Sequence, residues 1–277
     1  MTPPASIPGE PDDDDRTPDA FGGRHTDDID WDDVADVICV GGGLGVAMAG
    51  AARAAGLDVL LVEAGGSPTT GSGLAGLLGS AHADSEHYLR ALTEEFDPVD
   101  VTAPDVPVRV VDGPSPAESR RTRLPTFHGA ALRDWGSSCV AARYGLLYTR
   151  VYDPRLSASY TGPDGTVEVT VLATIELDSD RPGASVANWL AGLVDEEGES
   201  HGTLQHLVFD GGAVVGAALS TEDGVRLVRT RHGVMLSPLA AETDSSAEDL
   251  EADTTAEVAL VSRAASRFGR LELLRRT

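Results

Sequence analysis

The stretch that decides the fold is DVICVGGGLGVAMAGAARAAGLDVLLVEAGG, residues 36–66. It opens with a short apolar run that is typical of a strand buried on both faces. A glycine turn, an alanine-rich segment that stops at Gly56, and a second apolar run over residues 57–62 follow. Glycine commonly follows the last residue of a helix. The order therefore predicts a strand, a helix and a second, parallel strand, joined by a right-handed crossover.

The glycine turn has the chemistry of a dinucleotide site. Gly41 permits a tight turn out of the strand, and Gly43 has no Cβ, so a pyrophosphate can approach the backbone. The start of the helix offers unpaired N–H groups and the positive end of its dipole to phosphates. Leu44 and Gly45 complete the candidate pyrophosphate contacts. Glu63, 22 residues after Gly41, ends the second strand, where an acid accepts hydrogen bonds from the adenosine ribose.

One position departs from this pattern. The third glycine of the fingerprint normally lets helix and strand pack closely, and Val46 stands in its place. A branched side chain there is expected to push the two apart or to shift the turn, unless Gly45 substitutes in a tightened turn. The residues predict a Rossmann-type unit that serves either FAD or NAD(P). The alternative is a retained scaffold with an empty site.

Residues 36–66 resemble the N-terminus of the FAD-dependent fumarate reductase/succinate dehydrogenase flavoprotein family, which includes the 3-ketosteroid Δ1-dehydrogenases. The next stretch, SPTTGSG at residues 67–73, looks like the Gly/Thr/Ser loop of that family, which contacts the FAD phosphates and the flavin edge. Thr69, Thr70 and Ser72 are the matching hydroxyl residues. The resemblance implies FAD as the cofactor, with NAD(P) less favoured.

A second block supports the resemblance. Apolar residues at helical spacing predict a helix over residues 184–197. Three runs at 203–209, 213–220 and 225–230, separated by turn signals, predict a β-meander, and residues 232–237 predict one more, separate strand. In the family this order completes the FAD domain, and the backbone that begins the first of these strands holds the adenine. Here that place falls to Thr203 or Leu204. The family's Ala-Thr-Gly-Gly ending and its later flavin-wrapping segment have no counterpart in this sequence.

The predicted fold class is α/β: a Rossmann-like FAD/NAD(P)-binding domain with a β-meander, plus a mixed α+β inserted region. A strand at 106–111 and a hairpin of 156–160 with 166–177 are expected in that region. The chain is divided into a disordered acidic tail (1–30), the first part of the dinucleotide-binding domain (31–75), an inserted cap-like region (76–183), the second part of that domain (184–240), an acidic linker (241–257) and a C-terminal hairpin (258–277).

Charge and composition exclude several function classes. The net charge is −24, and much of it is concentrated in residues 1–33 and 242–257, which leaves a protein partner of these acidic segments as one possibility. With no basic face, nucleic-acid binding is not expected. All 21 basic residues are arginine, which excludes lysine Schiff-base chemistry and a Walker-type phosphate loop. The sequence shows no signal peptide, no run long enough to span a membrane and only two cysteines, so a cytoplasmic protein is expected.

Dehydrogenation beside a flavin needs a base and a group that polarises the substrate. His128, Arg133 and Tyr144 have suitable chemistry and are weak catalytic candidates, chosen on residue type alone. The spacing of His82 and His87 matches no metal motif, so no metal site is expected. The sequence therefore predicts an FAD-binding flavoprotein, an oxidoreductase acting on a small molecule that it does not identify. The alternative is a non-catalytic, degenerate flavoprotein scaffold or partner-binding protein.

Overall fold

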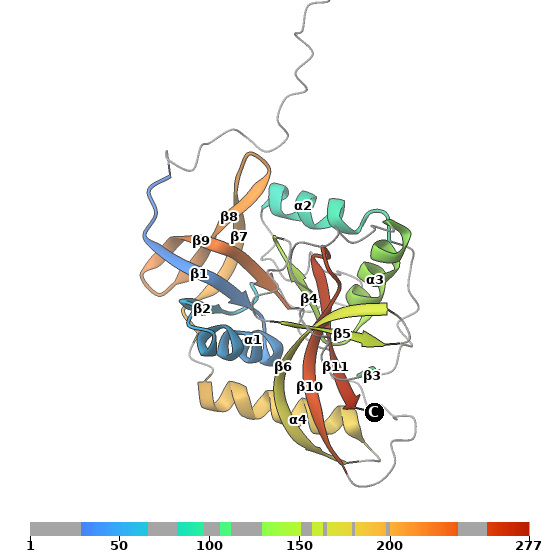
Figure 1. Cartoon of the computed structure of the whole chain (residues 1–277). Helices are drawn as coiled ribbons and strands as arrows, with labels where there is room; N and C mark the ends of the chain where they lie inside the picture. The colour runs from blue at the N-terminus through green and yellow to red at the C-terminus, as the bar shows by residue number, and fades with distance from the viewer. Residues whose placement is uncertain are drawn as a thin grey trace, which may run out of the picture.

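The computed structural model describes residues 29–65, 82–96, 106–111, 129–150, 157–162, 165–178, 181–197, 200–237 and 254–276. Within these ranges the chain forms a mixed α/β structure, with four helices packed around one large, curled sheet of eleven strands (Figure 1). None of the helices in these ranges is long and apolar enough to cross a membrane.

The strand–helix–strand unit predicted from residues 36–63 is confirmed. It consists of β1 (Asp33–Val40), α1 (Gly43–Ala54) and β2 (Val59–Val62). The two strands are parallel, in a register that pairs Val37 with Val59 and Val40 with Val62. α1 ends where the sequence predicts, because Gly56 adopts a φ of +81° and its N–H donates to the carbonyl oxygen of Arg53 at 2.8 Å.

The second block also folds as a helix and a meander. It comprises α4 (Pro182–Glu197), β7 (Thr203–Asp210), β8 (Ala213–Thr221) and β9 (Gly224–Leu236). β7, β8 and β9 are joined as successive antiparallel neighbours, which confirms the predicted meander. β9 then runs parallel to β1 and ends beside it. The meander and the strand–helix–strand unit are therefore parts of one sheet.

The prediction of a separate strand at residues 232–237 is wrong, because β9 continues through this region without a break. The pairing with β1 has an irregularity between Ala35 and Val37, opposite Gly233. Gly233 has a φ of +116°, and its N–H donates to the hydroxyl oxygen of Thr230 at 3.0 Å. A local irregularity at a glycine bends the strand without ending it, so two expected strands merge into one.

The remaining elements are the strands of the other half of the sheet and the helices α2 and α3. They are α2 (Ala83–Thr93), β3 (Val108–Val111), α3 (Gly129–Ala141), β4 (Gly145–Tyr148), β5 (Ala158–Gly162), β6 (Gly165–Leu177), β10 (Thr254–Ser262) and β11 (Phe268–Arg276). The expected strand at 106–111 and the two expected hairpins, β5–β6 and β10–β11, are confirmed. The strand order is β2-β1-β9-β4-β11-β10-β6-β5, with β3 also paired to β11. The C-terminal hairpin thus lies inside the sheet, between β4 and β6.

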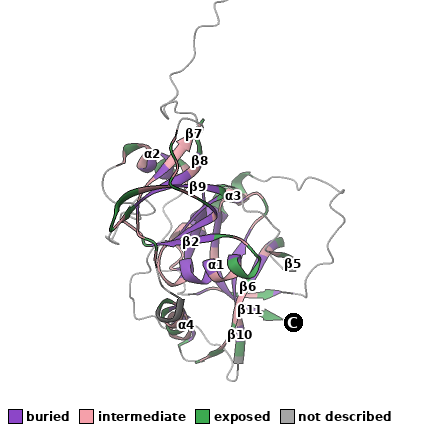
Figure 2. Ribbon diagram, turned by 90° about the vertical axis from the view of Figure 1, so that its left-hand side faces the viewer, coloured by how far each residue is buried: buried purple, intermediate pink, exposed green. Residues whose placement is uncertain are grey.

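The helices cover the two faces of the sheet in pairs. Side chains of α1 and α4 share one apolar cluster with Val37 and Cys39 of β1. Side chains of α2 and α3 share another with Ile38 and Val40, whose side chains point to the opposite face. Figure 2 shows the buried residues concentrated along the strands and on the inner side of α1. α4 therefore lies on the same face of the sheet as the helix that carries the glycine turn.

Candidate functional site

The turn between β1 and α1 is fixed from two sides. The N–H of Gly41 donates to the carbonyl oxygen of Val62 at 3.1 Å, and the N–H of Ser237 donates to that of Val40 at 2.9 Å. Gly41 has a φ of +126°, and a Cβ added there would collide with the carbonyl oxygen of Ser237. This glycine is therefore required by the close approach of the end of β9.

Gly45 provides the close contact between helix and strand that the third glycine normally provides. A Cβ added to Gly45 would lie 3.3 Å from the carbonyl carbon of Val40. Val46 is 3% exposed and belongs to the apolar cluster of α1, β1 and β2. The N–H of Val46 donates to the carbonyl oxygen of Gly42 at 3.1 Å, so the helix begins normally. Val46 therefore contributes to the core, and Gly45 allows α1 to approach β1.

Glu63 and the start of β7 lie side by side, as neighbours in the sheet. The backbone of Glu63 forms a parallel bridge with Thr203, and the N–H of Leu204 donates to the carbonyl oxygen of Glu63 at 2.9 Å. The Glu63 side chain is exposed and accepts a hydrogen bond from the hydroxyl of Ser200 at 3.0 Å. Leu204 is fully buried and its N–H is engaged, whereas Thr203 is half-buried and pairs with Ser220 of β8.

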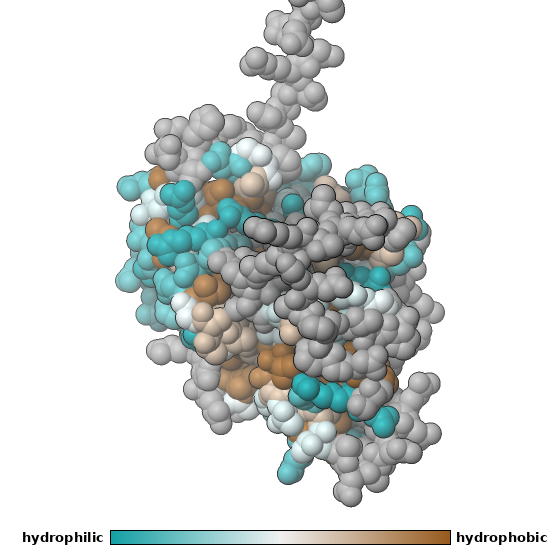
Figure 3. Space-filling model, in the orientation of Figure 1, coloured by the Kyte–Doolittle hydropathy of each residue, from teal (hydrophilic) through white to brown (hydrophobic). Residues whose placement is uncertain are grey.

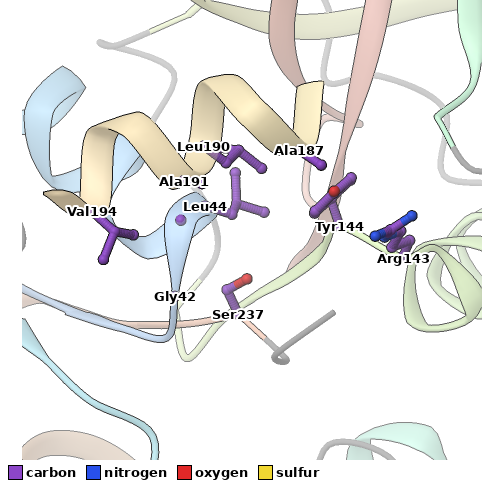
Figure 4. A pocket seen from close by; sticks show the side chains of 10 residues that line it. Gly42, Leu44, Arg143, Tyr144, Ala187, Leu190, Ala191, Val194 and Ser237 are labelled. Atoms are coloured by element: carbon purple, nitrogen blue, oxygen red, sulfur yellow. The ribbon is translucent and has the colours of Figure 1, made fainter. Parts of the chain in front are cut away.

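A pocket of about 200 Å³ opens at the N-terminus of α1, next to the ends of β1 and β9 (Figure 4). The glycine turn contributes Gly42, Gly43 and Leu44, and β9 leads into Ser237. α4 forms one wall, and Arg143 and Tyr144, which precede β4, form the far end. The remaining wall residues are Ala187, Leu190, Ala191 and Val194 of α4. A guanidinium group and the N-terminus of a helix both favour an anion.

The face of Gly43 assigned to pyrophosphate is occupied by α4. A Cβ added to Gly43 would lie 2.6 Å from Cβ of Leu190 and 3.1 Å from its carbonyl oxygen. Figure 4 shows Leu190 beside Leu44, directly over the glycine turn. The pocket is also smaller than the roughly 300–1,000 Å³ typical of small-molecule sites. The space over Gly43 that a pyrophosphate needs is therefore filled while α4 holds this position.

The catalytic candidates divide into three groups. Tyr144 is buried, lines the pocket, and lies under the guanidinium of Arg143, whose carbon is 5.3 Å from the centre of the tyrosine ring. Arg133 lies on α3, where its 43% exposed side chain pairs with Asp134 at 3.6 Å, and it does not line the pocket. His128 lies outside the described residues, as do the predicted loop residues Thr69, Thr70 and Ser72.

Sequence reasoning missed two polar residues of the pocket, Arg143 and Ser237, and the apolar wall that α4 provides. Ser237 follows β9 directly and Arg143 precedes β4, so both lie at the edge where the parallel strands β1 and β9 end. Ligands in parallel sheets bind at this edge. The position of Ser237 at the end of an apolar run was a usable signal. Nothing in the sequence pattern connects Arg143 to residues 41–45.

Neither cysteine has the environment of a reactive thiol. Cys39 and Cys139 are both buried. Burial raises the pKa of Cys39 to about 12 and raises that of Cys139 as well. A thiol with such a pKa is not ionised near neutral pH and is a poor nucleophile, so both residues serve the core.

No protein-family model matches the chain, and no curated protein matches it by sequence. The likeness to fumarate reductase-like flavoproteins therefore depends on the motifs in residues 36–73 and 184–237 alone. Figure 3 shows a largely hydrophilic face over β7, β8 and β9, with apolar atoms gathered lower, near α1, α4 and β6. This distribution does not add to the likeness.

Proposed function

We propose that this protein is an FAD-binding flavoprotein with a Rossmann-like nucleotide site at the ends of β1, β2 and β9. The observation that carries the proposal is the convergence of Glu63, Thr203 and the glycine turn at one edge of the sheet. A parallel strand–helix–strand unit that ends in an exposed acid is the arrangement that binds adenosine diphosphate in dinucleotide sites.

In this proposal each element has a distinct role. The carboxylate of Glu63 accepts hydrogen bonds from the ribose hydroxyls, and the backbone near Thr203 contacts the adenine. The N–H groups of residues 43–45 face the phosphates. FAD is favoured over NAD(P) because Thr69, Thr70 and Ser72 match the hydroxyl loop of the flavoprotein family.

The activity we propose is that of an oxidoreductase of the fumarate reductase-like type, acting on a small molecule. When bound, the flavin would supply the redox chemistry. Tyr144 and Arg143 line the pocket beside the glycine turn, and they are the groups suited to orient and polarise an anionic substrate there. Tyr144 would act through its hydroxyl group and Arg143 through its charge and its hydrogen bonds. Variants of the two residues can test these roles separately.

A second candidate function is that of a non-catalytic scaffold that binds a partner. One observation favours it: the face of Gly43 that a pyrophosphate needs is filled by Leu190. In such a protein the glycine would be required for the packing of α4 on α1. The negative charge concentrated in residues 1–33 and 242–257 would then attract a basic partner.

The absorbance spectrum of the purified protein distinguishes the two functions. A flavoprotein, incubated with FAD and then desalted, retains the two flavin absorbance bands in proportion to the protein. The bands of an active oxidoreductase also bleach when a reductant is added and return in air. A protein that stays colourless after incubation with FAD contradicts the flavoprotein proposal and supports the scaffold.

A further inference from the structure

The helix α4 and the residue Ser200 that follows it engage two groups of the proposed nucleotide site. Leu190 of α4 lies on Gly43, at the pyrophosphate position. Ser200 donates its hydroxyl to Glu63, at the ribose position, at 3.0 Å. We propose that this segment is an autoinhibitory lid, which competes with the dinucleotide for Gly43 and for Glu63 and must move before the site is filled. This inference rests on the proposed function and adds its regulation.

The lid is anchored mainly by apolar burial. Val186 is fully buried and Leu190 is 4% exposed, and both belong to the cluster that α1 forms with the sheet. Near its start, the hydroxyl of Ser185 accepts a hydrogen bond from the N–H of Asp178 at 2.9 Å. Ser185 and Val186 hold the start of α4 against β6 and α1, and the contact of Leu190 with Gly43 must break when the lid opens. α4 ends at Glu197, three residues before Ser200, whose hydroxyl donates to Glu63.

Two features favour movement of the second half of α4. On one side α4 borders the open pocket, so Ala187, Ala191 and Val194 face free space there. At the other end, Ser200 forms an exposed hydrogen bond, of the kind that contributes little net stability in water. A ribose hydroxyl can replace the Ser200 hydroxyl on the Glu63 carboxylate one for one. The nucleotide therefore replaces the side-chain contact of Ser200, while the N–H of His201 stays bonded to the carbonyl oxygen of Leu61 at 2.9 Å.

Competition of this kind has a definite thermodynamic consequence. If the site is accessible only in the open state, the apparent affinity is the intrinsic affinity multiplied by the open fraction. A substitution that weakens the closed state without touching the ligand therefore raises the affinity for FAD. This direction is diagnostic, because loss of a residue that merely supports the site lowers the affinity.

The test compares FAD binding to the full-length wild type with binding to Ser200→Ala, Leu190→Ala and Asn188→Ala, by quenching of flavin fluorescence. Ser200→Ala lies at the surface, so it does not threaten folding. Leu190→Ala removes the buried anchor of the lid. Asn188→Ala is the matched control, because it shortens an exposed residue of the same helix that does not line the pocket. Leu190 is chosen as the anchor because the atoms nearest to a Cβ added at Gly43 all belong to this residue.

We expect FAD to bind Ser200→Ala about threefold and Leu190→Ala about tenfold more tightly than the wild type, with Asn188→Ala within about twofold. Hydrogen exchange in residues 186–194 is expected to become faster when FAD is added to the wild type. If the wild type binds FAD and both lid variants bind it equally or more weakly than the wild type, the lid is overturned. The proposed function is then left standing. Absence of FAD binding by every variant overturns both.

Discussion

Leu190 lies so close to Gly43 that a methyl group added to the glycine would come within 2.6 Å of the leucine Cβ. The sequence pattern assigned the bare glycine to the approach of a pyrophosphate. In the folded chain the same bare backbone lets α4 rest on α1. Both requirements select glycine at this position, so the glycine fingerprint by itself does not distinguish a nucleotide site from a helix contact.

The packing of α4 on Gly43 predicts a clear stability difference between two glycine substitutions. Gly43→Ala should lower the free energy of unfolding by about 2 kcal/mol, because it forces α4 away from α1. Gly192→Ala, in α4, has nothing within 4 Å of its added Cβ. It should raise the free energy of unfolding by about 0.5–1 kcal/mol through its better helix propensity. Urea denaturation followed by circular dichroism measures both. Equal effects of the two substitutions would show that α4 does not rest on Gly43.

A buried ion-pair cluster on the other face of the sheet predicts a second difference. Glu272 is fully buried and accepts hydrogen bonds from Arg109 at 2.5 Å and from Arg270 at 2.7 Å, and both guanidinium groups lie near the ring of Trp135. Glu272→Gln leaves two partly buried cations with a neutral partner, so a loss of about 3 kcal/mol in the free energy of unfolding is expected.

The matched control for Glu272→Gln is Glu257→Gln. Glu257 pairs with Arg276 at 2.9 Å, where the arginine side chain is half exposed. A solvent-exposed pair contributes little, so this substitution should cost less than about 1 kcal/mol. Thermal denaturation of the two variants side by side makes the comparison. A Glu272→Gln protein as stable as the control would mean that the buried carboxylate is not needed to hold Arg109 and Arg270.

The rings of His82 and His206 predict a pH dependence of stability. They stack with centroids 3.8 Å apart, which places His206 of β7 against the start of α2. Burial and the neighbouring His82 lower the pKa of His206 to about 4, although Asp84 opposes the shift. The unfolded chain then binds more protons than the folded one between about pH 4 and pH 6.5. Stability contributed by this site is therefore fully present above pH 6.5 and is lost as the pH falls toward 4.

His206→Gln should flatten the slope of unfolding free energy against pH in this window, by up to about one proton. His201→Gln changes an exposed histidine just before β7 and is the control. Urea denaturation at a series of pH values measures the slope. A slope unchanged by His206→Gln would mean that His206 titrates alike in the folded and unfolded chain.

Much of the local structure could be predicted from the sequence, because it depends on local periodicity and turn residues. The strand–helix–strand unit, α4, the meander and the two hairpins follow from runs such as residues 57–62 and 184–197. Local pattern does not specify which strands pair across the sheet. The insertion of β10–β11 between β4 and β6, and the merging of two expected strands into β9, depend on long-range contacts.

The candidate site follows the same division. Gly41, Gly45 and Glu63 lie in one continuous motif, so the sequence could place them together. Arg143 and Leu190 are about a hundred residues or more away along the chain and reach the turn only through the tertiary fold. Leu190 in particular is an ordinary apolar position of an amphipathic helix. Only its contact with Gly43 shows that it covers the proposed site.

The adenosine half of the cofactor should dominate binding, because the residues that converge at the site belong to that half. ADP should therefore displace FAD from the protein, whereas FMN, which lacks the adenosine, should not compete at similar concentrations. Flavin fluorescence recovered on addition of ADP measures the displacement. Displacement by FMN and not by ADP would place the determinants of binding elsewhere on the chain.

The measurement that tests the central claim most directly is the affinity for FAD of the wild type and of Glu63→Gln. Glu86→Gln on α2, where the side chain is partly exposed, is the control. The carboxylate of Glu63 is proposed to accept the ribose hydroxyls, and a charged acceptor contributes about 1.5–3 kcal/mol to a hydrogen bond. The account predicts saturable binding by the wild type, weakened about tenfold or more in Glu63→Gln and unchanged in Glu86→Gln. FAD binding that is the same in all three proteins would contradict a nucleotide site at the end of β2.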